Sequence, residues 1–475
     1  MSEDEKNPNF SEAFDAGETP SRLSGATFFL LCAMLVFSTL AFGAVDVWAL
    51  GALSLFAGSI AVCWLADAWL KGEFRFNAST LQIPLAALIL IGLIQMLPLR
   101  SQNISSDLLA IPAAASLSLA PYATQLAVVQ LIAYFIFFAA ALAFINSQIR
   151  LRKIVLTIII FSSLMAFYGI LQRLANLEAI YGLRSPGQAF PFASFVNQHH
   201  FAAFMEMTMG LTLGLLFGKA TKANKRIFLL IAVVIMGIAL VFTSSRGGML
   251  SLLGVVGFVV VANLLQKPTG EIDLTIENGK NFRRSFAFIG GGLALILVLF
   301  GTVLLLGGDE SLLRGIGLSN PEDISNGRTH FWQIAWRIFL DYPIIGAGLD
   351  AFAFAFTRYD SWNGVFRIEQ AHNDYLQILA EAGVLGFACV ASFIYLLFKR
   401  SVSIIGKSSD AFRRGAGIGA LAGCFGILIH SFFDFPLRTP SNALFFLSLV
   451  ALATVSISLQ KTSRKKRLKS RLDPE

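Results

Sequence analysis

The sequence predicts an all-α integral membrane protein with about twelve transmembrane helices and one large loop, on the outer side of the membrane, that contains interfacial helices. Three observations lead to this fold class. Of the 475 residues, 56% are hydrophobic and only 14% are charged, whereas soluble domains carry about 25% charged residues. Apolar runs of about 18 or more residues, each long enough to cross a bilayer, recur from end to end. Lysine and arginine are unevenly distributed among the segments between these runs.

The apolar runs divide the chain into two groups of spans. Residues 1–24 are polar and acidic and lack the basic start of a cleavable signal peptide, so the first run is expected to act as an uncleaved anchor. The spans fall between residues 25 and 306 and between residues 375 and 459. Their expected ranges are 25–45, 48–70, 81–98, 124–145, 153–171, 199–218, 226–243, 248–266, 285–306, 375–398, 413–433 and 441–459.

Positive charge orients these spans. With the N-terminus in the cytoplasm, every lysine lies in a cytoplasmic segment, and the basic tail at 460–475 is expected to contact anionic lipid head groups. Only ten of the 37 Lys and Arg residues remain on the outer side, and all ten are arginines. All five histidines also map to that side or to an outer helix end.

Outer arginines run against the positive-inside rule, so they call for an explanation. A guanidinium binds phosphate through two parallel hydrogen bonds and stays charged. Snorkelling or pairing with nearby acids is the alternative, and it is expected to account for more than half of these arginines. The nearby acids are Asp309, Glu310, Glu322, Asp323 and Asp360.

Residues 307–374 form the large loop between the ninth and tenth spans. Apolar residues recur there at helical spacing and predict an interfacial helix over 329–340, which ends before Pro343. The stretch GAGLDAFAFAF then predicts a second interfacial helix or a close backbone turn. Arg328 stands directly before the first helix, where the helix N-terminus and the guanidinium together suit a phosphate. An exposed loop arginine is the alternative.

Two further polar stretches stand at outer helix ends. TSSRGGML places Arg246 beside glycines that permit close approach of an anion, and a snorkelling arginine is the alternative. EQAHNDYL places His372 directly before a span. Its imidazole can accept a proton near neutral pH, although an exposed loop histidine also fits. Asn373 suits the N-cap of that span, and Asp374 suits its first turn.

The remaining polar groups and the cysteines give weaker indications. Glu206 and Glu381 lie at membrane depth, where ionisable residues are costly and are therefore candidates for function. Gly383 and Gly386 predict close helix packing. The four cysteines lie singly in apolar runs and predict neither a disulfide nor a metal site. No nucleotide-binding motif occurs, and the net charge of +8 is explained by the topology rather than by nucleic acid.

Five segments in order resemble the O-antigen ligase and polymerase superfamily of bacterial membrane glycosyltransferases. They are VNQHHFAAFMEM (196–207), TSSRGG (243–248), GRTHFW with DYPIIGAGLDAF (327–352), AHNDYLQILAEAGVLG (371–386) and HSFFDFPLRTP (430–440). The family's arrangement of about twelve spans and one large periplasmic loop extends the resemblance over most of the chain. The ligase-related core is expected at about 196–390.

The resemblance implies a metal-independent enzyme without a cofactor, in the inner membrane, whose active site faces the periplasm. Its donor would be a glycan on undecaprenyl diphosphate, and a single attack at the anomeric carbon would invert that centre. Arg246 and Arg328 are implied to bind the pyrophosphate, and His372 to activate the acceptor hydroxyl. Supporting roles are expected for Asn373, His330, Arg337 and Glu381.

Three functions are compatible with these residues. The first is an O-antigen ligase that passes the glycan to lipid A–core in lipopolysaccharide biosynthesis. The second is an O-antigen or exopolysaccharide polymerase that joins lipid-linked repeat units, since it needs the same pyrophosphate site and the same base. The third is a polytopic transporter, which is disfavoured because charges within the spans are sparse and the large loop is off-centre.

Overall fold

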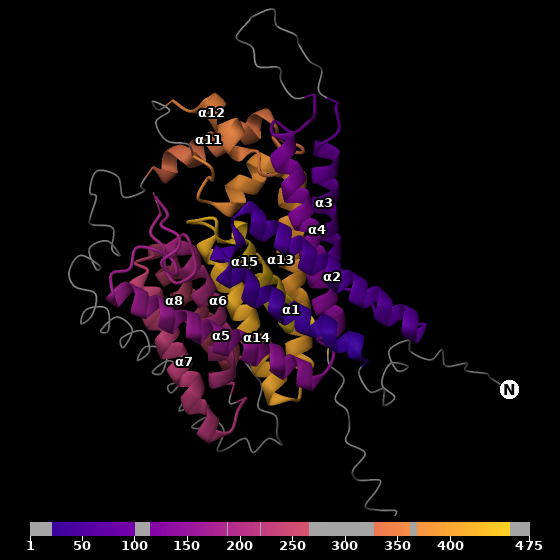
Figure 1. Ribbon diagram of the computed structural model, residues 1–475, viewed down its shortest axis with the longest axis vertical. Coiled ribbons are helices and arrows are strands. Elements are labelled where there is room, and N and C mark those ends of the chain that lie inside the picture. Colours follow the sequence, from indigo (N-terminus) through magenta and orange to yellow (C-terminus); the bar gives the residue numbers. More distant parts are fainter. Residues whose placement is uncertain are drawn as a thin grey trace, which may run out of the picture.

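The computed structural model describes residues 21–99, 115–187, 189–218, 220–265, 327–361 and 368–456. Within these ranges the regular elements are helices, joined by turns and two isolated β-bridges. Figure 1 shows them gathered into one bundle, with α11 and α12 together at one end. In chain order the helices are α1 (Arg22–Leu40), η1 (Phe42–Ala44), α2 (Val47–Lys71), α3 (Gln82–Gln95), α4 (Pro121–Phe144), α5 (Gln148–Leu174), α6 (Gln198–Phe217), α7 (Ala223–Phe242), α8 (Arg246–Leu264), α11 (Arg328–Asp341), α12 (Phe352–Tyr359), α13 (Asp374–Lys407), α14 (Ala411–His430), η2 (Pro436–Arg438) and α15 (Pro440–Thr454).

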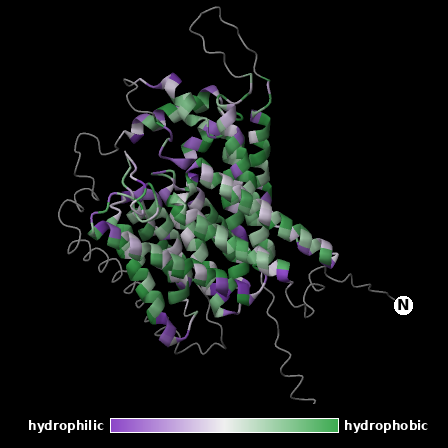
Figure 2. Ribbon diagram, viewed as in Figure 1, coloured by the Kyte–Doolittle hydropathy of each residue, from purple (hydrophilic) through white to green (hydrophobic). Residues whose placement is uncertain are grey.

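Nine of the described helices are long and apolar enough to cross a membrane. The shorter apolar helix α3 falls within the predicted span 81–98, and α15 overlaps the predicted span 441–459 but begins one residue earlier. The predicted span 285–306 lies outside the described residues. Apolar residues dominate the middle of the bundle, and polar ones gather mostly at its ends (Figure 2). The all-helical, multi-pass membrane fold is therefore confirmed, whereas the number of twelve spans stays a prediction.

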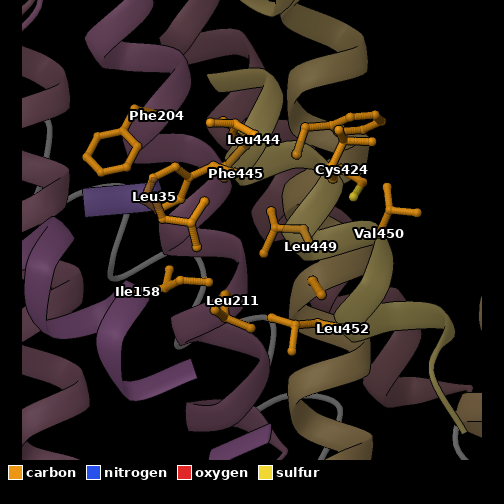
Figure 3. Packing of buried hydrophobic residues seen from close by; sticks show 14 of the residues in the cluster. Leu35, Ile158, Phe204, Leu211, Cys424, Leu444, Phe445, Leu449, Val450 and Leu452 are labelled. Atoms are coloured by element: carbon orange, nitrogen blue, oxygen red, sulfur yellow. The ribbon is translucent and has the colours of Figure 1, made fainter. Parts of the chain in front are cut away.

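The centre of the bundle is formed by α6, α14 and α15. Figure 3 shows the packed interior, where Phe204 of α6 and Phe445 of α15 meet edge to face at 4.8 Å between ring centroids. A Cβ on Gly214 of α6 would lie only 2.3 Å from the Cα of Gly419 on α14. Small residues of this kind let two membrane helices approach closely. The first half of α14 is therefore held closely against α6.

The predicted helix over 329–340 is observed as α11. Its buried residues, such as Phe331 and Ile338, pack together with Phe352 and Phe356 of α12 and with the start of α13. The stretch GAGLDAFAFAF forms both a turn and a helix, because a turn at residues 349–350 leads into α12.

The prediction that Gly383 serves helix–helix packing is wrong. Gly383 has φ +62° and ψ −162° and breaks α13. The amides of Ala347 and Gly348 donate to the carbonyls of Ala380 and Glu381, and the amide of Val384 donates to Pro343. A Cβ on Gly383 would lie 2.4 Å from the carbonyl carbon of Ile344. The glycine is needed because the loop enters the broken helix and supplies its backbone partners.

Candidate functional site

His372 lies in the turn directly before α13. Its φ of +52° is in the left-handed region, which costs a residue with a side chain about 1–3 kcal/mol and is often found at functional sites. The imidazole packs 5.9 Å from the ring of Phe331 on α11 and 4.8 Å from the ring of Phe435, between centroids. The strained backbone and two aromatic neighbours therefore fix the direction of this side chain.

Asp434, in the turn after α14, is the partner of His372. The Nδ1 atom of His372 lies 3.1 Å from Oδ1 of Asp434. Burial alone would raise the pKa of Asp434, but the hydrogen bond with His372 and its charge, with His199 and His200 nearby, hold that pKa well below its usual range. A carboxylate at Nδ1 holds the proton on that nitrogen, so the lone pair of the neutral imidazole is on Nε2.

The same carboxylate attracts Arg328, the first residue of α11. The Nη2 atom of Arg328 lies 3.7 Å from Oδ2 of Asp434, an oxygen that has no hydrogen-bond partner among the described residues. Burial lowers the pKa of Arg328, Asp434 raises it, and repulsion from Arg246 lowers it further. The fold therefore brings His372 and Arg328, from two separate segments, to one buried acid, and it places Arg246 near enough to Arg328 to repel its charge.

The N-terminus of α8 sets the position of Arg246. Ser245 is the N-cap and accepts a hydrogen bond from the amide of Gly248 at 3.2 Å. A Cβ on Gly247 would lie 3.0 Å from Cδ2 of His430, so this turn rests on the His430 ring.

His430 is itself held by Glu206. Its Nδ1 atom lies 3.1 Å from Oε2 of Glu206, and both side chains are buried. Glu206, which the sequence indicated as a functional candidate, thus supports the turn that carries Arg246.

Asn373 has the capping role that the sequence predicted. Its Oδ1 accepts hydrogen bonds from the amides of Tyr375 and Leu376, each at 3.0 Å. Its Nδ2 donates to the carbonyl of Phe432 at 3.1 Å. Asn373 therefore ties the start of α13 to the turn that contains Asp434, and so fixes the distance between His372 and its partner.

Glu381 belongs to a second charged group at the same end of the bundle. Arg438 pairs with Glu381 and, at 3.4 Å, with Asp350. Glu381 also accepts hydrogen bonds from the amide of Asp350 at 3.0 Å and from Gln377 at 2.9 Å. Burial would lower the pKa of Arg438, but its carboxylate partners raise it. This Arg438 group joins the loop, the break in α13 and the turn before α15.

His330 and Arg337 lie apart from the His372 group. The Nε2 atom of His330 is 3.1 Å from Oδ1 of Asp360, at the end of α12. Arg337 is exposed and follows Arg328 by nine residues on α11, which places the two arginines on opposite faces of the helix. Of the four predicted supporting residues, the structure therefore brings only Asn373 to His372.

A cavity of about 1030 Å³ opens beside His372. Its polar wall includes Asp350, Glu369 and Arg438, and its apolar wall comes from α2, α3, α4 and α13. The arginines Arg246 and Arg328 are not among its lining residues. His372 is therefore common to two environments, since it lines the cavity and shares Asp434 with Arg328.

No role was predicted for Asp434, Arg438 or Asp350, although all three lie in segments that carry the resemblance. The available signal is an acid and an arginine in FFDFPLRTP, a short polar turn between two apolar runs. Within the described residues, no group of three or more His, Cys, Asp or Glu side chains is arranged to hold a metal ion.

Comparison with known families identifies one region of the chain. Residues 231–391 match the family model described as O-antigen ligase, a range that contains Arg246, Arg328 and His372. No curated protein matches the chain. The domain supports a glycosyltransferase-like function of the ligase or polymerase type, acting on lipid-linked glycans. The resemblance to the O-antigen ligase superfamily is therefore confirmed, and residues 231–391 carry its domain.

Proposed function

We propose that this protein is an O-antigen ligase of the bacterial inner membrane. It moves a glycan from undecaprenyl diphosphate to a sugar hydroxyl of lipid A–core, with inversion at the anomeric carbon. In this proposal the loop 307–374 and the site face the periplasm, and the segments 1–24 and 460–475 are cytoplasmic. The observation that carries the proposal is the buried Asp434 carboxylate, which holds His372 on one oxygen and attracts Arg328 to the other.

His372 has the role of general base. With Nδ1 directed to Asp434, the Nε2 atom takes the proton from the acceptor hydroxyl as that oxygen attacks the anomeric carbon. The new C–O bond forms while the bond from the anomeric carbon to the diphosphate oxygen breaks. Asp434 stabilises the imidazolium that results, as the acid of a catalytic triad does.

Arg246 and Arg328 have the role of binding the leaving group. The departing undecaprenyl diphosphate keeps the electron pair of the broken bond and gains negative charge. Two guanidinium groups stabilise this charge, and they do so best where solvent is excluded. Their mutual repulsion in the free protein is relieved when an anion binds between them, so this mechanism needs no metal ion.

The test uses the purified full-length protein in nanodiscs with an undecaprenyl-diphosphate oligosaccharide, with and without lipid A–core. A product that requires lipid A–core, and is lost in His372→Ala and Arg328→Gln, is expected. A ladder of products without lipid A–core would instead identify a polymerase that uses the same residues. Absence of any product from the wild type with either acceptor would overturn the proposal and favour transport.

A further inference from the structure

The cavity beside His372 has an acidic polar wall. Among the described residues, its charged lining groups are the acids Asp350, Glu369 and Asp374 and one arginine, Arg438. Arg438 is already paired with Glu381 as well as with Asp350, so its positive charge is neutralised within the wall. The cavity wall is therefore negatively charged, whereas the neighbouring region, where Arg246 lies near Arg328, is positively charged.

Asp350 is an exposed acid of the cavity lining. Its side chain is 47% exposed, although its residue lies in a turn that is packed against the break in α13. Its φ of +59° is in the left-handed region, and the hydrogen bond from its amide to Glu381 holds it there. Such strain persists only where the surroundings enforce it, and it gathers at sites that bind ligands.

His200 adds a second, independent feature of a binding site. It lines the cavity but is only 7% exposed. Its Nδ1 atom is hydrogen bonded to Oγ1 of Thr439 at 2.7 Å, and its Nε2 atom has no hydrogen-bond partner in the described part of the chain. A buried polar atom without a partner is unfavourable, and a ligand hydroxyl group supplies what it lacks.

We infer that this cavity is the acceptor site, and that its acidic wall selects an acceptor sugar that is neutral or carries an amino group over one that carries a phosphate or sulfate. The inference rests on the proposed function. Carboxylates accept hydrogen bonds from hydroxyl and ammonium groups and repel anions. The anionic diphosphate is thereby directed to Arg246 and Arg328, while the acceptor hydroxyl approaches His372 from the cavity.

The first experiment measures the charge of the cavity directly. Ala127 of α4 lines it and packs near Leu349, the residue before Asp350. The full chain carries Ala127→Cys, with its own cysteines Cys32, Cys63, Cys389 and Cys424 replaced by serine. A cationic methanethiosulfonate reagent is expected to react about tenfold faster than an anionic one. Asp350→Asn and Glu369→Gln should each lower this ratio, whereas Glu178→Gln, at an exposed loop residue outside the lining, should leave it unchanged.

The second experiment asks what occupies the cavity. Methyl glucosaminide and methyl glucoside are expected to slow modification of the Ala127→Cys cysteine, whereas methyl glucoside 6-sulfate and inorganic pyrophosphate are not. Equal rates for the two reagents, or protection by pyrophosphate, would overturn the inference. Both experiments measure cysteine modification, so neither requires the lipid-linked donor or glycan transfer. If the Ala127→Cys variant shows this selectivity while the wild type transfers no glycan, the sugar site would be retained and the proposed transfer would be rejected.

Discussion

Two groups of charged side chains lie at the same end of the bundle, and they differ in what they leave for a substrate. The first contains His372, Asp434 and Arg328, and the second contains Arg438, Glu381 and Asp350. In the first, the His372 side chain is 29% exposed, and among the described residues Oδ2 of Asp434 has one distant ion-pair partner, at 3.7 Å. In the second, Glu381 is fully buried and both of its carboxylate oxygens have partners.

The difference between the two groups gives a way to tell functional from structural polar residues at membrane depth. Such residues are costly and are therefore suspected of function, but Glu381 is accounted for by the loop and the broken helix that it joins. His372 is accounted for only if something binds at its Nε2 atom. The useful criterion is thus an accessible polar atom whose hydrogen-bonding capacity the fold leaves unused.

Removal of the base should have the largest effect. We expect His372→Ala to lower the rate of glycan transfer by about 10²–10⁴-fold, the usual contribution of general acid–base catalysis. His330→Ala is the control, because His330 lies in the same loop but pairs with Asp360, and it should transfer at close to the wild-type rate. Equal transfer rates for His372→Ala and the wild type would show that His372 is not the base, and the His372 group would then be structural like the Arg438 group.

The two arginines of α11 offer a matched comparison. Arg328→Gln should lower the transfer rate by about 10²–10³-fold, because it removes a donor that stabilises the leaving diphosphate. Arg337→Gln makes the same chemical change on the opposite, exposed face of the helix and should have little effect. Similar losses in both variants would point to the overall charge of the loop instead of a defined diphosphate site.

Substitution of Glu381 should have the opposite effect: it should lower the stability of the protein and leave the rate of glycan transfer nearly unchanged. Glu381→Gln leaves Arg438 without its buried anionic partner, and we expect a loss of about 1.5–3 kcal/mol in the free energy of unfolding, the range for hydrogen bonds to charged groups. Thermal unfolding in nanodiscs measures this, with Glu178→Gln as the control. The rate of glycan transfer by the variant that stays folded should be nearly unchanged. If the variant instead loses transfer while its free energy of unfolding is unchanged, Glu381 takes part in the reaction itself.

The smallest effect concerns pH. Burial raises the pKa of Asp350 to about 6, with Glu381 and Glu369 adding to the shift and Arg438 opposing it. Asp350 is therefore charged at pH 7.5 and becomes neutral as the pH falls to 5. The preference of the Ala127→Cys cysteine for the cationic reagent should fall by roughly threefold over this range. Asp350→Asn should flatten that pH dependence, and a dependence that persists in this variant would assign the titration to another group.

The amino-acid sequence by itself determined the features that depend on neighbours along the chain. Long apolar runs gave the membrane helices, helical spacing of apolar residues gave α11, and the HND order gave the Asn373 cap. These features are local because hydropathy, periodicity and capping act over one run or one turn. The sequence also placed His372, Arg328 and Arg246 at helix starts, where phosphate binding and proton transfer are physically reasonable.

Only the tertiary structure decided which of these residues have partners. His372 meets Asp434 across 62 positions of sequence, and Glu206 meets His430 across 224. Each pairing depends on which helix ends come together, and no periodic pattern along the chain contains that information. Gly383 gives the same lesson, because AEAGVLG fits a packed helix equally well. Its helix breaks where the loop before α13 supplies the backbone hydrogen bonds that the break leaves open.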